Sequence, residues 1–325
     1  MPSQRPKLLV LNFMAELHQG MVTPHFDLIY APTAELRAAH VYAPTAELRA
    51  AHVLADGAQI RAVLTIGSVG LSAVEMDAMP ALEIVCALGV GYENIDVAHA
   101  RARGIVLANG AGTNDDCVAD HAFALLLAAV RNVPKLDQQC RLGVWRDALP
   151  LSASVSRRRL GIVGLGGIGH KVAQRGLGFG MQIGYHGRKR QEHVAHSYFA
   201  DLLALAEWAD FLVVATPGGP TTRHLVDTKV LAALGADGYL VNVSRGSVVD
   251  TAALAEALRA GVIAGAGLDV YESEPKPPQE LLEFDNLVLT PHVGGWSPQA
   301  IEASVLRFVE NATRHFAGQA VVSPI

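Results

Sequence analysis

Short β-branched runs alternate with Ala- and Leu-rich stretches of helical character along the chain, and this alternation constrains the fold more than any other feature. Eleven runs have the length of a strand, five in the first third and six in the later part. They read KLLVLN, FDLIYA, AVLTIG, LEIVCALG and IVLAN, then RLGIVG, MQIGYH, FLVVAT, YLVNVS, AGAGLDV and NLVLTPH. Because strand–helix–strand units build parallel sheets, the pattern predicts an α/β protein with two doubly wound parallel sheets.

The chain of 325 residues is long enough for two domains, each with its own core. A long helical pattern over residues 117–145 is expected to cross from one domain to the other, and an apolar stretch over 299–316 follows the last strand. Because that stretch can return to the first sheet, we expect a discontinuous first domain of residues 1–111 and 300–325. The second domain, residues 112–299, is then inserted into it.

Twelve residues, YAPTAELRAAHV, occur at 30–41 and again unchanged at 42–53. A tandem this short does not make a solenoid and indicates a recent local duplication, natural or introduced. Pro32 and Pro44 each suit the start of a helix, and Pro44 would interrupt one merged helix. We expect an extra helical turn or bulged loop on the surface of the first domain, which function tolerates because longer loops cost little free energy.

Composition argues against several classes of protein. Half of the residues are hydrophobic, 18% are charged and the net charge is −5, which is typical of a globular protein without a nucleic-acid or membrane partner. The three cysteines, Cys86, Cys117 and Cys140, fit neither a disulfide framework nor a metal site, so we expect no metal and a cytoplasmic location. The start lacks the apolar core of a signal peptide, and no apolar run is long enough to span a bilayer.

The segment LGIVGLGGIGHKVA places Gly164, Gly166 and Gly169 as G-x-G-x-x-G after a strand and at the start of a helical stretch. In that setting the first glycine makes the tight turn, the second lets the backbone approach a pyrophosphate, and the third packs helix on strand. The amides of the helix N-terminus, with Gly167 and Ile168 among them, would hold the phosphates. A tight turn without a ligand is the alternative.

The next strand ends near His186, where NAD-selective sites hold an acid for the ribose hydroxyls. Here the residues that follow are Gly187, Arg188, Lys189 and Arg190. Gly187 has no side chain and leaves space, and the guanidinium group of Arg188 can bind a 2′-phosphate, which favours NADP over NAD. Lys189 or Arg190 could supply a second charge, and a solvated basic turn is the alternative.

Polar residues follow three later strands, at the ends where ligands of α/β proteins bind: Arg245 in VNVSRGSVVD, Glu274 in GLDVYESEP and His292 in LTPHVGGWS. Such a trio suits carbonyl reduction with a nicotinamide as hydride source. A protonated histidine can donate to the forming alkoxide, a carboxylate beside it favours the protonated form, and an arginine can hold a substrate carboxylate. Taken singly, each residue could instead be an ordinary loop or helix-start residue.

The motifs GIVGLGGIG, ATPGGPTTRHLV, LVNVSRGSVVD, AGAGLDVYESEP and LTPHVGGWS resemble, in order and spacing, those of the D-isomer-specific 2-hydroxyacid dehydrogenases. The resemblance covers nearly the whole chain. It implies a Rossmann domain inserted into a flavodoxin-like substrate domain, a homodimer formed through the dinucleotide domains, and a catalytic trio of Arg245, Glu274 and His292. Glu272 is nearby, but the matching position, five beyond Asp269, is Glu274.

The resemblance also implies binding residues. In ALGVGYENID, backbone amides around Val90 and Gly91 would bind the substrate carboxylate together with Arg245. Around the cofactor it implies positions on the crossover helix and after several strands: Val118, Thr216, Pro217, Val243, Asp269 and Gly294.

Within the family, the missing acid and the GRKR turn are similar to the NADPH-preferring glyoxylate/hydroxypyruvate reductases and the 2-ketogluconate reductases. The expected activity is NADPH-dependent reduction of a small 2-oxoacid to the D-2-hydroxyacid, with His292 as proton donor. The alternatives are an NAD-linked D-lactate or phosphite dehydrogenase and a non-catalytic dinucleotide-sensing protein similar to the corepressors of this fold. Two departures stand out: Arg-rich sequence replaces a Gly-Lys before RLGIVG, and the residues just after Trp145 read RDALPL, without the second tryptophan that some reductases have a few residues beyond that position.

Overall fold

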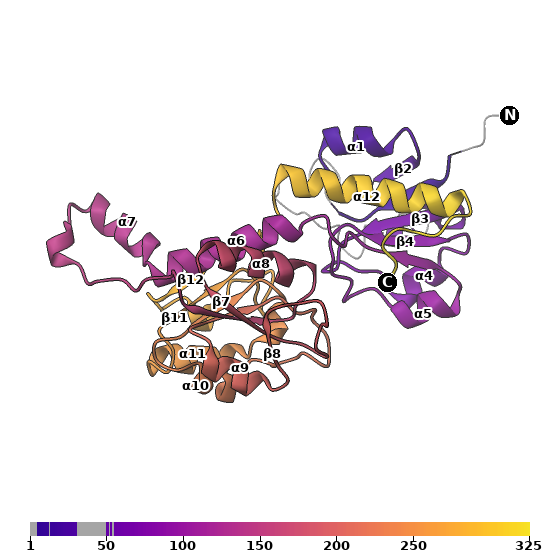
Figure 1. The fold of residues 1–325 in the computed structure, drawn as a ribbon. Coiled ribbons are helices and arrows are strands. Elements are labelled where there is room, and N and C mark those ends of the chain that lie inside the picture. Colours follow the sequence, from indigo (N-terminus) through magenta and orange to yellow (C-terminus); the bar gives the residue numbers. More distant parts are fainter. Residues whose placement is uncertain (1–4, 13, 31–49, 52, 54) are drawn as a thin grey trace. The chain divides into compact units, whose positions relative to one another are not determined.

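The computed structural model describes residues 5–12, 14–30, 50–51, 53 and 55–325. The chain divides into two compact units (Figure 1), residues 1–114 with 297–325 and residues 115–296. The sequence analysis put the boundaries at 111/112 and 299/300, against 114/115 and 296/297 in this division. The tandem repeat at 30–53 lies almost wholly outside the described residues, so the extra turn expected there stays a prediction.

The first unit is built on a five-stranded parallel sheet in the order β2-β1-β3-β4-β5, the order of flavodoxin-like folds. Its strands are β1 (Lys7–Val10), β2 (Asp27–Tyr30), β3 (Ile60–Thr65), β4 (Ile84–Ala87) and β5 (Val106–Ala108). All five coincide with predicted runs, because strands buried on both faces read as continuous apolar sequence.

Helices cover both faces of this sheet (Figure 1). On one face, Leu8 and Val10 of β1 pack with α1 (Glu16–Val22) and α12 (Pro298–Phe316). On the other face, Leu9 packs with residues of α4 (Ala73–Asp77) and α5 (Val97–Ala102). The alternation along β1 is the two-residue period of a strand.

The second unit contains a seven-stranded parallel sheet in the order β12-β11-β10-β9-β6-β7-β8. Its strands are β6 (Arg159–Val163), β7 (Gln182–His186), β8 (Ser197–Phe199), β9 (Phe211–Val214), β10 (Tyr239–Asn242), β11 (Gly265–Leu268) and β12 (Leu287–Leu289). The order reverses between β6 and β9, which is the switch point where doubly wound sheets bind their ligands. This is the predicted Rossmann architecture.

One face of this sheet packs on α6 (Asp115–Val130) and α8 (Gly167–Gly178). The other packs on α9 (Leu202–Trp208), α10 (Thr228–Leu234) and α11 (Thr251–Arg259). Each of these last three helices begins after an aspartate whose side chain accepts a backbone N–H of the first turn, and those caps are Asp201, Asp227 and Asp250. Short 3-10 turns lie at η1 (Gly57–Gln59), η2 (Arg146–Ala148), η3 (Gly246–Val248) and η4 (Gln279–Leu281).

Two predictions about individual elements were wrong. The sequence analysis expected six strands in this sheet and missed β8, because Ser197–Phe199 is a three-residue edge strand with no buried residue. It also read residues 117–145 as one long helical pattern, whereas the helix stops at Val130 and restarts as α7 (Val133–Arg141). Asn132 adopts a left-handed conformation (φ 51°) at the break. Pro134 has no amide proton with which to continue α6.

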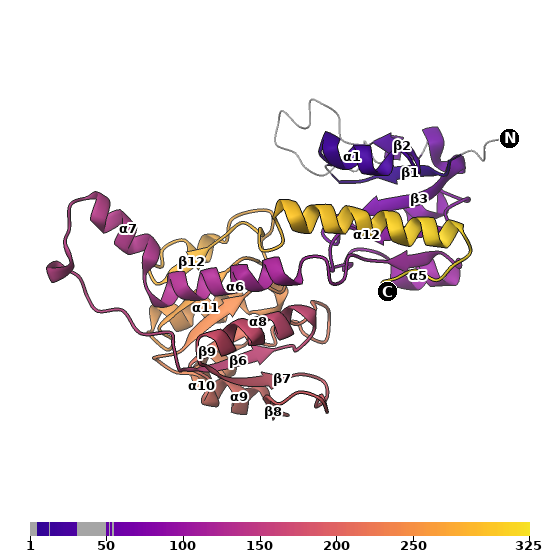
Figure 2. The same cartoon turned by 45° about the horizontal axis from the view of Figure 1, so that its top comes forward.

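α7 and the loop that follows it stand off the sheet of the second unit (Figure 2), and we call residues 132–151, none of which is buried, the arm. α7 runs along the arm and buries none of its residues. Large apolar side chains are exposed along it, at Val133, Leu142, Trp145 and Leu151. Among the described residues no single helix is long and apolar enough to cross a membrane, and α6 with α7 reaches that length only across a 58° bend.

Candidate active site

A glycine-rich turn joins β6 to α8. Gly164 has a φ of 95°, and a Cβ there would come within 2.7 Å of the Thr216 backbone, so only glycine makes this turn without strain. A Cβ at Gly169 would lie 2.1 Å from the Gly164 carbonyl oxygen, which explains the third glycine. A Cβ at Gly166 would meet nothing within 4 Å, so the start of the twelve-residue helix α8 is open to a ligand. These features fit the phosphate-binding turn of a dinucleotide site.

A carboxyl group that the sequence analysis missed lies beside this turn. A Cβ at Gly167 would be 2.0 Å from Asp115 Oδ2, so Asp115 occupies the space that a longer side chain at 167 would need. Burial raises the pKa of Asp115, the charge of Asp116 adds to the shift, and Lys171 opposes it. Asp115 therefore lies against the turn at which the sequence predicts the phosphates.

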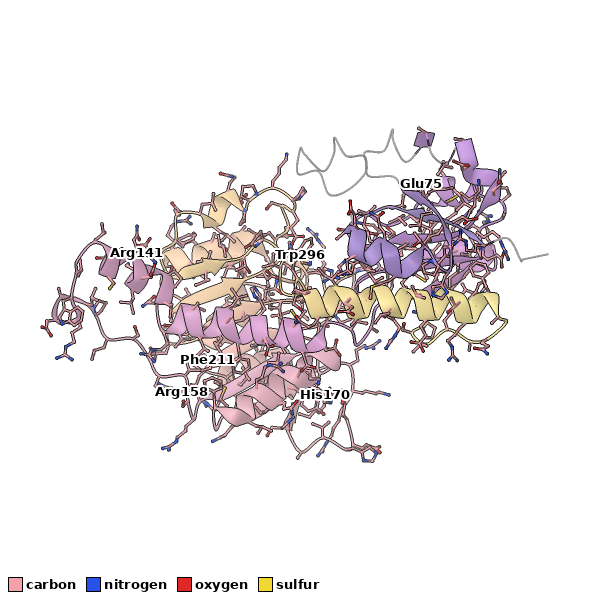
Figure 3. All side chains as sticks on the ribbon, turned by 90° about the horizontal axis from the view of Figure 1, so that it is seen from above. Glu75, Arg141, Arg158, His170, Phe211 and Trp296 are labelled. Atoms are coloured by element: carbon pink, nitrogen blue, oxygen red, sulfur yellow. The ribbon has the colours of Figure 1, made fainter. Side chains whose placement is uncertain are left out.

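The basic turn follows β7. Gly187 leaves open space, since a Cβ there would meet nothing within 4 Å, and Arg188, Lys189 and Arg190 are exposed. None of these three cations has a hydrogen-bond or ion-pair partner within the described ranges of the chain. Just after them, Gln191 Nε2 donates to the Leu165 carbonyl at 2.7 Å, which ties the basic turn to the glycine-rich turn. His170, labelled in Figure 3, lies in the first turn of α8, with Nδ1 2.8 Å from the Gly166 carbonyl oxygen.

The three predicted polar residues follow the neighbouring strands β10, β11 and β12. His292 Nδ1 lies 2.8 Å from Glu274 Oε2, and the His292 side chain is 43% exposed. Burial opposes ionisation of Glu274, but the hydrogen bond and charge of His292, the Tyr271 amide and the charge of Arg245 together lower the pKa of Glu274. The structure therefore pairs His292 with Glu274 and brings the charge of Arg245 close enough to stabilise the carboxylate.

The neighbouring Glu272 has a different partner. Its Oε1 lies 2.8 Å from His224 Nε2, and its Oε2 accepts from the Thr251 hydroxyl at 2.8 Å. A Cβ at Gly246 would lie 1.9 Å from the Tyr271 carbonyl carbon, so the loop after β10 lies directly against the loop that carries both glutamates. Of the two acids, only Glu274 reaches His292.

Asp269 holds the turn that carries His292. It is 2% exposed, and its carboxylate accepts from the Val293 amide at 2.8 Å, the Gly294 amide at 2.7 Å and the Thr290 hydroxyl at 2.7 Å. Burial opposes its ionisation, but the hydrogen bonds from His121, Thr290 and the two amides outweigh burial and lower the pKa of Asp269. His292 has a φ of 55°, a left-handed conformation that costs a non-glycine residue free energy and persists only where its surroundings impose it.

The other expected cofactor positions lie near the ends of β9 and β10. The Thr216 carbonyl accepts from the Ser244 hydroxyl, and the Pro217 carbonyl accepts from Thr222 Oγ1 at 2.8 Å. Val118 and Val243 are buried in the same apolar cluster. In the first unit, Val90 and Gly91 follow β4, and Asn109 Nδ2 donates to the Val90 carbonyl at 2.8 Å.

Sequence reasoning missed two further polar residues of this site, His121 and Thr290. His121 Nε2 lies 2.8 Å from Thr290 Oγ1 and 3.3 Å from Asp269 Oδ1. The available signals were weak: Thr290 directly follows β12, and His121 is one helical turn beyond Val118 on α6. Neither position alone indicates which side chain it meets.

Comparisons with known proteins agree with this geometry. Residues 123–294 match the family profile described as "D-isomer specific 2-hydroxyacid dehydrogenase, NAD binding domain". The chain is 39% identical to a 2-ketogluconate reductase of Gluconobacter oxydans over 81% of this chain and 85% of the relative. It is 39% identical to a glyoxylate/hydroxypyruvate reductase of Arabidopsis thaliana over 76% of this chain and 77% of the relative.

A solved structure is similar along the whole chain. It is an NADPH-dependent glyoxylate/hydroxypyruvate reductase from Sinorhizobium meliloti in complex with NADP and malonate, with a TM-score of 0.86 and 38% identity. The match covers 99% of this chain and 97% of that one. The chain therefore belongs to the D-isomer-specific 2-hydroxyacid dehydrogenase family, as its motifs indicated.

The hydrogen bonds of Asp269 generate a prediction about stability. Asp269→Asn is expected to lower the free energy of unfolding at neutral pH by about 1–3 kcal/mol, because an amide cannot accept at both ends. The folded state holds the pKa of Asp269 below its ordinary value of 3.8. The stabilisation is therefore present above pH 3.8 and is lost as the pH falls through the folded value, so the difference between wild type and variant shrinks in acid.

The measurement is urea unfolding of both proteins at a series of pH values from neutral to acid. Asp237→Asn, at an exposed aspartate of the same unit, is the control and is expected to match the wild type. A difference between Asp269→Asn and the wild type that stays constant at all pH values would contradict the prediction.

Proposed function

We propose that this protein reduces a small 2-oxoacid of the glyoxylate, hydroxypyruvate or 2-ketogluconate type to the D-2-hydroxyacid with NADPH. The observation that carries the proposal is the 2.8 Å contact between His292 and Glu274, at the end of the sheet that also carries Arg245 and the glycine-rich turn. The names of the relatives support the substrate class, since they include 2-ketogluconate and glyoxylate/hydroxypyruvate reductases.

The trio has distinct roles in the proposal. Glu274 accepts from His292 Nδ1, which orients the ring. Nε2 of His292, which has no partner in the described part of the chain, then donates the proton to the carbonyl oxygen of the substrate. Arg245 binds the substrate carboxylate, together with the backbone amides of Val90 and Gly91, whose assignment rests on the family likeness alone.

The residues of the second unit suit a dinucleotide. The phosphates would lie on the amides from Gly166 to Gly169, and the nicotinamide side would involve the positions implied by the family: Val118, Thr216, Pro217, Val243, Asp269 and Gly294. When bound, the nicotinamide supplies the hydride. The preference for NADP is supported by three exposed cations after β7, by the absence of an acid at its end, and by a relative described as NADPH-dependent.

Removal of the proton donor tests the reaction. His292→Ala is expected to lower kcat for glyoxylate or hydroxypyruvate reduction by roughly 10²–10⁴-fold, the usual loss for a missing general acid. The decrease in NADPH absorbance measures it. His224→Ala is a matched control, because His224 has the same 2.8 Å contact with a glutamate of the same loop and is expected to keep kcat near the wild-type value. Wild-type turnover in His292→Ala would refute the assignment.

Removal of one basic side chain tests the cofactor preference. Arg188→Ala is expected to lower the ratio of kcat/KM for NADPH to that for NADH by roughly 10- to 100-fold, because a charge-assisted hydrogen bond to the 2′-phosphate contributes about 1.5–3 kcal/mol. Lys189→Ala and Arg190→Ala show which neighbour assists. Arg158→Ala, at another exposed arginine of the same unit, is expected to leave the ratio unchanged. An unchanged ratio in Arg188→Ala would show that the turn does not select the cofactor.

We propose as well that the protein is a homodimer in which the arm of each protomer packs on the other. The support is the exposed apolar surface of the arm and an open cavity of about 390 Å³ whose wall includes Pro275, Pro278 and Leu282 beside Glu274 and His292. In a symmetric dimer, the apolar surface of a second copy would cover the arm and the cavity of the first.

A charge on the arm tests this assembly. Trp145→Glu is expected to convert the dimer into a monomer, because a carboxylate would be buried in an apolar interface. Size-exclusion chromatography with light scattering measures the mass. Leu177→Glu, at a 55% exposed leucine of α8 against 70% for Trp145, is the control and is expected to stay dimeric. A monomeric wild type, or a dimeric Trp145→Glu, would contradict the proposal.

A further inference from the structure

We infer that His121 is a positioning residue for His292, because it fixes the two side chains that hold the turn on which His292 lies. The inference rests on the proposed role of His292 as proton donor. His121 projects from α6, and among the described residues its side chain has no hydrogen bond or ion pair with His292. It acts through Thr290 and Asp269, with Nε2 2.8 Å from Thr290 Oγ1 and 3.3 Å from Asp269 Oδ1.

The direction of each hydrogen bond follows from the number of protons. The Thr290 hydroxyl has one proton and donates it to Asp269 Oδ1 at 2.7 Å. At its contact with His121, Thr290 Oγ1 can therefore only accept, so His121 Nε2 carries a proton and donates it. His121 is thus the outermost donor of a chain that ends on a buried carboxylate, and its Nε2–H tautomer is set by that chain.

Thr290 and Asp269 between them make the contacts that define the turn. The His292 amide donates to the Asp269 carbonyl at 2.8 Å and to the Thr290 carbonyl at 3.0 Å. The next two amides, of Val293 and Gly294, donate to the Asp269 carboxylate. Because His292 is held in a left-handed conformation, small movements of Thr290 or Asp269 change the direction of its ring and its 2.8 Å contact with Glu274.

The surroundings of His121 argue against a merely space-filling role. The buried side chains on α6 are apolar, among them Val118, Ala122, Leu125 and Leu126, and they pack in one cluster with the strands. His121 is not among these buried residues, and its side chain is 20% exposed. An apolar side chain at 121 would preserve the packing of the helix but would leave Thr290 Oγ1 without its donor.

Two substitutions separate the donor from the ring. His121→Phe keeps an aromatic ring without a donor, and His121→Gln places an amide N–H near the position of Nε2. With saturating NADPH, His121→Phe is expected to lower kcat for the 2-oxoacid about 10- to 100-fold with little change in KM. Proton donation depends on sub-ångström placement of His292, whereas binding of the substrate does not use the hydrogen bonds of His121. His121→Gln is expected to recover most of kcat.

A second measurement does not depend on turnover. Hydrogen exchange of the Val293 and Gly294 amides is expected to accelerate at least tenfold in His121→Phe and to return towards the wild-type rate in His121→Gln. If the wild type reduces no 2-oxoacid, the proposed function is wrong. Hydrogen exchange of the two amides then still tests whether His121 stabilises the turn. Thr290→Val removes this contact together with the Thr290–Asp269 hydrogen bond and is expected to change kcat and exchange at least as much, which tests the chain of hydrogen bonds if His121→Phe does not fold.

His99→Phe is the matched control, because His99 Nε2 makes a similar 2.8 Å contact, with Asp77 in the first unit. This variant is expected to leave kcat and hydrogen exchange unchanged. Wild-type kcat together with wild-type exchange in His121→Phe would overturn the inference. Failure of His121→Gln to recover either quantity would overturn it as well, since the hydrogen bond would then not be what matters.

Discussion

The candidate site depends on the hydrogen bonds that the buried carboxylate of Asp269 accepts. It lies at the carboxyl end of β11 and accepts from two consecutive backbone amides and a hydroxyl of the turn after β12. A carboxylate buried to this extent is stable only when its oxygens are saturated by donors. The same donors fix the turn, so the free energy that keeps Asp269 ionised also holds His292 in its left-handed conformation, with its ring against Glu274.

The sheet assembles the rest of the site around this anchor. β10, β11 and β12 are neighbours and parallel, so the residues after them come to one edge although they are far apart in the chain. The loops then separate two chemically equivalent acids. Glu274 faces His292 and Glu272 faces His224, each at 2.8 Å, and the loop around Gly246 packs against the segment between them. Local sequence chemistry does not distinguish these two pairs.

Much of the fold could be predicted because buried parallel strands and the glycine turn leave strong local signals. All eleven predicted strands exist, and Gly164, Gly166 and Gly169 have the geometry that their spacing indicates. The misses have physical causes. β8 is a short edge strand with nothing buried, and α6 ends at Val130 although the helical pattern continues, because Pro134 and the left-handed Asn132 interrupt it. The contacts of Asp115 with Gly167 and of His121 with Thr290 depend on how the helices pack. The sequence of a single segment does not predict such packing.

By itself the sequence determined the two doubly wound sheets, the phosphate-binding turn, the basic turn after β7 and the positions of Arg245, Glu274 and His292 at strand ends. These depend on local periodicity, on glycine conformation and on the order of motifs, all of which are written in consecutive residues. Only the tertiary structure showed that the Glu274 carboxylate lies 2.8 Å from His292 Nδ1, and that α6 contributes His121 to the support of that turn. The reason is that hydrogen-bond partners are selected over distances of about 3 Å, and the sequence does not specify distances between segments far apart in the chain.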